Sequence, residues 1–167
     1  MALQSRLEAE EFRLSEILRP EGIALDFHAE SVAEALGHVV ALLVRAKFIG
    51  PSDAPLARLN FLDREEISPT GYKYGMALPH ARGPWTMGAV IAHYPGGLDW
   101  PTRDELTVHL VIGIALPESG FRGYSLYVPQ LGQMLAEGKL EKRVLAAKGP
   151  NDIIDAIEEI EDDAIVP

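Results

Sequence analysis

Residues 62–81 read LDREEISPTGYKYGMALPHA, and the rest of this 167-residue chain is best understood outward from them. The Ser, Pro, Thr and Gly of residues 68–71 favour a turn. Residues 75–79 form a short apolar stretch between a Gly and a Pro, which predicts a brief strand. His80 follows directly, so we expect its side chain to be presented where a rigid strand gives way to a loop.

The surroundings of His80 favour chemistry on a phosphoryl group. A neutral imidazole can act as a nucleophile and carry a covalent group. The oxygens of a phosphoryl group need cations and hydrogen-bond donors around them. Arg64, Lys73 and Arg82 supply cations near His80 in the sequence, and Thr70 supplies a hydroxyl. These four residues are therefore the candidates to contact phosphate.

Other catalytic and metal-binding patterns are missing from the sequence. The chain has no cysteine, which excludes disulfides, thiolate catalysis and zinc fingers. There is no nucleophile elbow, Walker loop or dinucleotide-binding glycine motif, and no histidine pair has the spacing of a zinc site. We therefore expect no metal and no nucleotide cofactor. The remaining histidines carry no motif and are predicted to be structural: His28, His38, His93 and His109.

Upstream of the opening stretch, the pattern is helical. Ser31 and Glu34 form a capping box before an apolar helical repeat, which we expect to end at Gly50-Pro51. Ser52 or Asp53 then caps a second helix. Its apolar positions are Leu56, Leu59, Phe61 and Leu62. Weaker patterns predict an irregular helix over residues 3–18 and a short strand over 23–27.

Downstream, strands come first and helices follow. Residues 87–94 predict a strand, residues 95–97 a turn, and residues 106–116 a strand that is apolar on both faces and therefore central in its sheet. Further helices are predicted over 125–136, over 140–147 and from Asn151 or Asp152 through Ile160. Grouped helices and strands of this kind favour an α/β fold, with a central mixed β-sheet of four to five strands flanked by helices on both faces.

The charge of the chain is concentrated at its ends. The net charge is −10, with −4 in residues 1–30, −7 in residues 150–167 and +1 between them. A surplus of acids argues against nucleic acid as a partner, since phosphate backbones attract Lys and Arg. The first residues have no apolar core of a signal peptide, and no apolar run is long enough for a bilayer span. We therefore expect a cytoplasmic protein without membrane insertion.

The longer string around His80 carries a family resemblance. From Arg64-Glu65 through Thr70-Gly71 to the Ala-Leu-Pro-His of residues 77–80, it resembles the signature of the fructose/mannitol-type enzyme IIA domains, nitrogen-regulatory members included, of the bacterial phosphoenolpyruvate-dependent sugar phosphotransferase system. The resemblance extends from the helix at Ser31 to Ile160. It implies the three-layer α/β/α fold of the phosphotransferase/anion transport protein-like group. It also implies a single IIA-like domain over residues 14–161, with a loose extension at 1–13 and an acidic tail at 162–167.

This resemblance implies an activity as well as a fold. In the family, the histidine matching His80 accepts a phosphoryl group from the phosphocarrier protein HPr, or its nitrogen-branch paralogue. It then passes the group to a IIB partner or serves as a regulatory signal. The matching Arg64 lies near the phosphoryl group, so the implied catalytic residues are His80, Arg64 and Tyr124, which occupies the place of the family's second histidine. A IIA domain contacts proteins rather than the sugar, so no particular sugar is implied.

Three positions depart from the family pattern. Pro69 replaces a usual serine, Lys73 replaces a glycine, and Tyr124 replaces a histidine. A tyrosine hydroxyl can hydrogen-bond an imidazole or a phosphate, but it is no titratable cation near neutral pH. Two functions therefore stay open: a phosphocarrier, and a regulatory module that binds target proteins with phosphotransfer altered or lost. An anion-transporter domain is disfavoured, because those domains lack the phosphoacceptor histidine.

Overall fold

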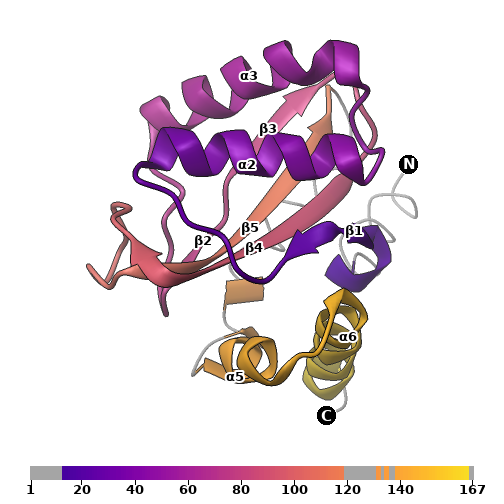
Figure 1. Cartoon of the computed structure of the whole chain (residues 1–167), viewed down its shortest axis with the longest axis vertical. Coiled ribbons are helices and arrows are strands. Elements are labelled where there is room, and N and C mark those ends of the chain that lie inside the picture. Colours follow the sequence, from indigo (N-terminus) through magenta and orange to yellow (C-terminus); the bar gives the residue numbers. More distant parts are fainter. Residues whose placement is uncertain (1–12, 119–130, 133, 136–137, 166–167) are drawn as a thin grey trace.

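In the computed structural model, a five-stranded mixed sheet lies between two layers of helices (Figure 1). The structure describes residues 13–118, 131–132, 134–135 and 138–165. The expected α/β/α architecture is confirmed. The strands are β1 (Leu18–Ala24), β2 (Met76–Ala77), β3 (His80–Gly83), β4 (Gly88–Leu98) and β5 (Val108–Pro117).

The strand β5 lies in the middle of the sheet, as its apolar pattern predicted. It runs antiparallel to β4 on one side. On its other side it pairs in parallel with β2 and then with β3, which follow one another along the same edge. The strand β1 pairs in parallel with β4 and forms the opposite edge. Consequently β1 and β3 lie at opposite edges of the sheet.

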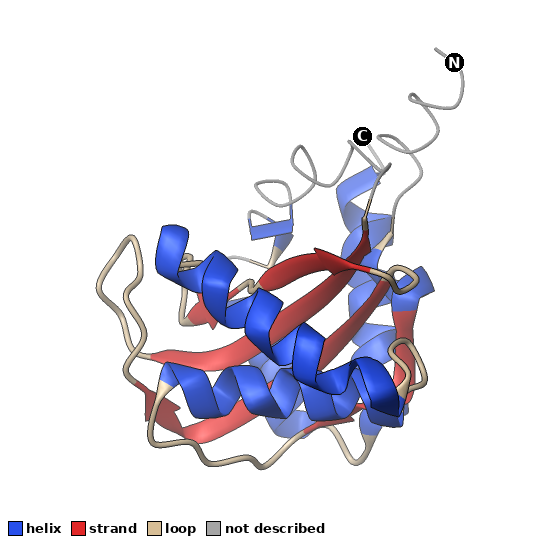
Figure 2. Ribbon diagram, turned by 90° about the horizontal axis from the view of Figure 1, so that it is seen from above, coloured by secondary structure: helices blue, strands red, loops and turns tan. Residues whose placement is uncertain are grey.

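One helical layer consists of α2 (Val32–Arg45) and α3 (Ala54–Ile67), preceded by the short helix η2 (Pro51–Asp53). Figure 2 shows the two long helices lying over the sheet. The predicted cap is confirmed, because the backbone N–H of Glu34 donates to the Ser31 hydroxyl at 3.1 Å. The predicted end of this helix at Gly50-Pro51 is wrong. The helix ends at Arg45 because Lys47 adopts a left-handed backbone with φ of 65°.

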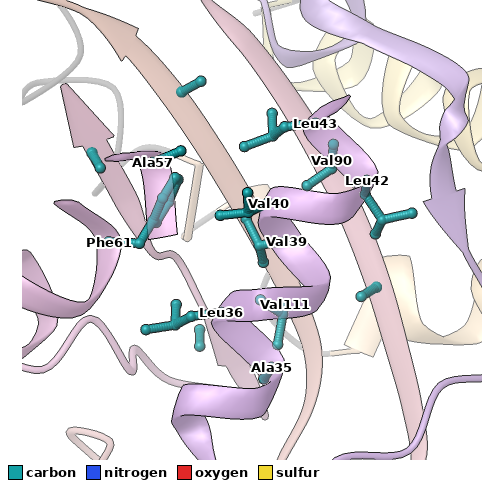
Figure 3. Close-up of a cluster of buried hydrophobic side chains, with 14 of the residues drawn as sticks. Ala35, Leu36, Val39, Val40, Leu42, Leu43, Ala57, Phe61, Val90 and Val111 are labelled. Carbon is teal, nitrogen blue, oxygen red and sulfur yellow. The ribbon is translucent and has the colours of Figure 1, made fainter. Parts of the chain in front are cut away.

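The core of this layer forms mainly on α2. Figure 3 shows Val39 and Leu43 of α2 clustered with Val90 of β4 and Val111 of β5. From α3, Phe61 and one alanine reach this core. Of the apolar positions predicted for α3, Leu56 and Leu59 are 43% and 54% exposed and so are wrongly predicted. The helix α3 buries only a narrow stripe, Ala57 and Phe61, where it packs against both α2 and the short edge strand β3.

The second helical layer contains the short helix η1 (Leu14–Ile17), α5 (Lys139–Ala146) and α6 (Pro150–Ile165). The helix α6 packs beside η1 and β1 (Figure 1). Its residue Glu161 is only 3% exposed and accepts hydrogen bonds from the backbone N–H groups of Leu14 at 2.7 Å and Ser15 at 3.2 Å. The guanidinium of Arg13 lies 3.8 Å from the same carboxylate and donates to Asp162 at 2.6 Å. These contacts, here called the η1–α6 joint, hold the two ends of the described chain together.

Several boundaries near the chain ends differ from the sequence predictions. Where an irregular helix was expected up to residue 18, η1 is one 3-10 turn and β1 begins at Leu18, earlier than the strand predicted at 23–27. The helix α6 starts at Pro150 and continues to Ile165, so Asp162 and Asp163 are helical rather than part of a tail. Most of the helix predicted over 125–136 lies outside the described residues, although Leu135 N donates to Leu131 O at 3.0 Å, the spacing of a helical turn.

The predicted turn at residues 95–97 is also wrong. These residues belong to β4, which stays paired with β5 beyond them. The register shifts between His93 and Leu98, and Gly97 has φ of 80°. An irregularity of this kind accommodates extra residues without ending a strand. Across the residues that the structure describes, no helix combines the length and the apolar character needed to cross a bilayer.

Candidate functional site

His80 is the first residue of β3 and lies opposite Ile114 of β5. The expectation that His80 marks the end of a strand is therefore wrong, because Leu78 and Pro79 separate β2 from a second short strand. Alternation along β3 directs Ala81 and Gly83 into the core beneath α2 and α3. His80 and Arg82 consequently share the opposite face of this edge strand.

A backbone hydrogen bond defines the tautomer of His80. Its Nδ1 lies 3.1 Å from the carbonyl oxygen of Leu78. A carbonyl oxygen can only accept, so Nδ1 carries the ring proton and donates it. In the neutral ring, the lone pair is therefore on Nε2. The position of the nucleophilic atom therefore depends on the connection between β2 and β3, which supplies the Leu78 carbonyl.

The environment of His80 keeps its imidazole neutral. Burial is the main cause that lowers its pKa below the ordinary value of 6.5. The hydrogen bond to Leu78 raises the pKa and so opposes burial, the charges of Arg64 and Arg82 lower it, and the charge of Glu65 raises it. The net shift is downward, so near pH 7 the ring is in its nucleophilic form.

The pKa values of two histidines in this chain are shifted in opposite directions. Exposed His28 donates to Glu30 at 2.6 Å, and this hydrogen bond raises its pKa. His80 should therefore protonate with a midpoint below 6.5 as the pH falls, and His28 with a midpoint above 6.5. Two-dimensional NMR of the ring C–H resonances across pH 4.5–8.5 measures both midpoints in one sample. A His80 midpoint at or above that of His28 would contradict the burial argument.

Two arginines lie around His80, as the sequence predicted. Arg64 lies in the last turn of α3 and donates to the carbonyl of Ser68 at 2.8 Å. Arg82 donates to the carbonyl of Pro117 at 2.9 Å, and its own carbonyl accepts from Asn60 at 3.0 Å. Both positive charges lower the pKa of His80, so both lie close enough to act on the imidazole. A guanidinium carries five N–H donors in a rigid planar fork, a geometry that suits phosphate oxygens.

Thr70 is directed toward a carboxylate. Its hydroxyl donates to Glu65 Oε2 at 2.5 Å, and its backbone N–H donates to Glu65 Oε1 at 2.8 Å. The same Oε1 accepts from the indole of Trp100 at 2.8 Å. Neither Glu65 nor Trp100 was among the site residues predicted from the sequence. A signal for Glu65 was present, because an acid directly follows Arg64 and a hydroxyl follows it five residues later.

The structure does not bring Lys73 to His80. Lys73 is exposed and precedes Gly75, whose carbonyl accepts from the N–H groups of His109 and Leu110. His80 pairs instead with Ile114, four residues further along β5. At about 3.3 Å per residue along β5, the positions of Gly75 and His80 are about 13 Å apart. Tyr124, the remaining predicted site residue, lies outside the described residues.

Comparison with known proteins identifies this arrangement. The family described as "Phosphoenolpyruvate-dependent sugar phosphotransferase system, EIIA 2" matches residues 16–160, which include His80 and both arginines. The chain belongs to the EIIA 2 family. This match confirms the resemblance read from residues 64–80. Members of the family are phosphotransferases.

Individual relatives show the range of the EIIA 2 family. The chain is 26% identical over 147 residues to the PTS system fructose-specific EIIABC component of Bacillus subtilis, covering 87% of this chain and 23% of that protein. It is 25% identical over 137 residues to the nitrogen regulatory protein of Pseudomonas aeruginosa, covering 81% and 88%. The EIIA domain thus spans about a quarter of the first relative and most of the second.

A solved structure shares the fold of this EIIA domain. The complex of enzyme IIAMtl with phosphorylated enzyme IIBMtl from Escherichia coli matches with a TM-score of 0.67 at 21% identity. The match covers 85% of this chain and 99% of that chain. The likeness supports the three-layer architecture built around β5.

Proposed function

We propose that this EIIA domain is a phosphocarrier in which His80 accepts a phosphoryl group from an HPr-type protein and passes it to a IIB partner. The observation that carries the proposal is the hydrogen bond from His80 Nδ1 to the Leu78 carbonyl. It leaves the lone pair of a neutral imidazole on Nε2, beside two arginine charges. The proposal places the chain in the cytoplasm, where phosphoenolpyruvate is made.

The proposed step is a direct exchange of nitrogen–phosphorus bonds. The Nε2 lone pair of His80 forms a bond to phosphorus while the bond between phosphorus and the donor's histidine breaks. The electron pair of the broken bond returns to the donor's ring nitrogen. Because Nε2 carries no proton in this tautomer, attack requires no general base. The substitution of Tyr124 for a histidine therefore removes no proton acceptor that this step needs.

The arginines supply the electrostatic part of the proposed step. Charge spreads over the three outer oxygens of a phosphoryl group during transfer, and catalysis is mainly positioning and charge stabilisation. Arg64 and Arg82 approach His80 from α3 and β3, and each is oriented by a hydrogen bond to a backbone carbonyl. Guanidinium groups held in this way need little reorganisation when a phosphoryl group arrives. In this proposal they are the residues that bind the phosphoryl oxygens.

The test of this function is phosphoryl transfer in a reconstituted system. Wild-type protein is incubated with ³²P-labelled phosphoenolpyruvate, enzyme I and HPr, and the label on the protein is measured. The expected result is one phosphoryl group per chain, lost in acid and stable in alkali, as a phosphohistidine bond requires. Protein that stays unlabelled with HPr and with the nitrogen-branch carrier would contradict the proposal.

A regulatory role is the second candidate, favoured by the alignment with most of the length of the nitrogen regulatory protein. In that role the phosphorylated and unphosphorylated forms would bind a target protein differently. The discriminating experiment adds purified IIB to the labelled protein. Loss of label to IIB within seconds supports the carrier role. Retained label, with a target protein captured by only one of the two forms, supports regulation.

A further inference from the structure

The carboxylate of Glu65 joins three segments of the chain. It lies in the last turn of α3 and accepts three hydrogen bonds: two from Thr70 in the following loop and one from Trp100 in the loop after β4. Thr70 and Trp100 are 9% and 2% exposed, so these bonds are largely shielded from water. Hydrogen bonds to an ionised acceptor are about twice as strong as neutral ones. Glu65 thereby fixes the position of Thr70 relative to α3.

A continuous path of hydrogen bonds leads from Thr70 to His80. The carbonyl of Thr70 accepts from the backbone N–H of Leu78 at 3.0 Å. The carbonyl of Leu78 in turn accepts from His80 Nδ1 at 3.1 Å. Along this path, the backbones of Thr70 and Leu78 are the covalent segments, and three hydrogen bonds connect them to the Glu65 carboxylate, to each other and to the imidazole. A displacement of Thr70 would move the carbonyl that selects the tautomer of His80.

The loop that contains Thr70 also packs closely against the segment that contains Trp100. Tyr72 O accepts from Arg103 N at 2.9 Å. At Gly71, a β-carbon would lie 2.0 Å from the carbonyl oxygen of Pro101, so only glycine fits there. The two segments approach so closely that one carboxylate can accept hydrogen bonds from both. Glu65 accepts hydrogen bonds from Thr70 in one segment and Trp100 in the other.

We propose that Glu65 is a positioning residue that holds His80 in its Nδ1–H tautomer, by fixing Thr70 and, through Leu78, the carbonyl that accepts from the imidazole. This inference rests on the proposed function only in taking His80 as the reactive group. Glu65 does not touch the phosphoryl group. Its effect is to keep the ring proton on Nδ1 and the lone pair on Nε2 before a donor arrives, so that no part of the population must change tautomer first.

Substitutions at two neighbouring acids separate this role from a general effect of charge. Glu65→Met keeps the length of the side chain but leaves the donors of Thr70 and Trp100 without the carboxylate. Glu65→Gln keeps the shape and removes the charge. Glu66 is the next residue of α3 and is exposed, so Glu66→Met and Glu66→Gln are the matched controls. Far-ultraviolet circular dichroism establishes that each variant is folded.

The readout is the tautomer of His80 in the unphosphorylated protein, measured by long-range ¹⁵N–¹H correlation of its ring. The wild type and both Glu66 variants should show the Nδ1–H form. Glu65→Met should gain the Nε2–H form and accept phosphoryl groups about tenfold more slowly, and Glu65→Gln should lie between. Unchanged tautomer and rate in folded Glu65→Met would overturn the proposal. If Glu65→Met does not fold, Glu65→Gln decides it, and values equal to those of Glu66→Gln overturn it.

The two arms of this experiment keep the inference distinct from the proposed function. The tautomer is read without any phosphoryl donor, so it decides the role of Glu65 even if the wild type never becomes labelled. A wild type that stays unlabelled overturns only the proposed function. A labelled wild type, with a tautomer and rate that do not respond to Glu65→Met, overturns only the positioning role.

Discussion

The substitution His80→Gln is expected to abolish phosphoryl acceptance entirely. A glutamine amide can still donate a hydrogen bond to the Leu78 carbonyl, but it has no nucleophilic nitrogen lone pair to bond phosphorus. The fold should survive, because His80 is only partly buried and the pairing of β3 with β5 uses the backbone. The measurement is the ³²P label per chain after incubation with phosphoenolpyruvate, enzyme I and HPr.

The control for this experiment is His28→Gln. His28 is exposed, and its only side-chain partner among those recorded in the described chain is the nearby Glu30, so its loss should leave labelling at the wild-type level. Circular dichroism and a thermal melt establish that both variants are folded. Label remaining on folded His80→Gln would show that another residue accepts the phosphoryl group, and the assignment of His80 would then be wrong.

The substitution Glu161→Ala is expected to lower the free energy of unfolding by about 3 kcal/mol. It removes the acceptor of the Leu14 and Ser15 backbone N–H groups and the carboxylate beside Arg13. Removing one side of a buried, hydrogen-bonded charge cluster costs about 3–5 kcal/mol, and the lower end fits a cluster that includes a partly exposed arginine. For a chain of this size the midpoint of thermal unfolding should fall by about 6–12 °C.

Urea denaturation monitored by circular dichroism measures this loss directly. The matched control is Asp163→Ala, which removes an exposed acid from the same helix and should change the free energy of unfolding by less than about 0.5 kcal/mol. At 25 °C the folded fraction of Glu161→Ala should still accept phosphoryl groups at the wild-type rate, since His80 lies at the far edge of the sheet. Equal stability of the two variants would mean that the Glu161 carboxylate contributes nothing to the stability of the η1–α6 joint.

The parts of the fold that could be predicted are those specified locally. The capping box at Ser31 and the apolar run that became β5 each depend on residues close together in the sequence, and both were confirmed. The failures depend on distant partners. His80 begins a strand because β5 offers an edge beside Ile114, and Leu59 is exposed because α3 turns a different stripe toward α2 and β3. Neither partner can be read from the sequence surrounding those residues.

The same division applies to the candidate site. His80, Arg64 and Arg82 could be found because they lie in one short string. The hydrogen bond between Glu65 and Trp100 joins residues 35 positions apart, and no local sequence pattern predicts it. The position of Lys73 was misjudged for a related reason. It precedes His80 by seven positions in the sequence, but β2 and β3 both extend along β5, so the intervening residues lead away from Lys73 instead of turning back toward it.

The η1–α6 joint also determines how this domain would behave as part of a longer polypeptide. Residues 13 and 162 are hydrogen-bonded to each other, so the first and last parts of the described chain meet at one place beside β1. This place is three strand spacings, about 14 Å, from the strand that carries His80. A neighbouring domain on a flexible tether that passes this place would therefore move around a point about three strand spacings from His80. Tethering of this kind raises the local concentration of a fused acceptor around the domain.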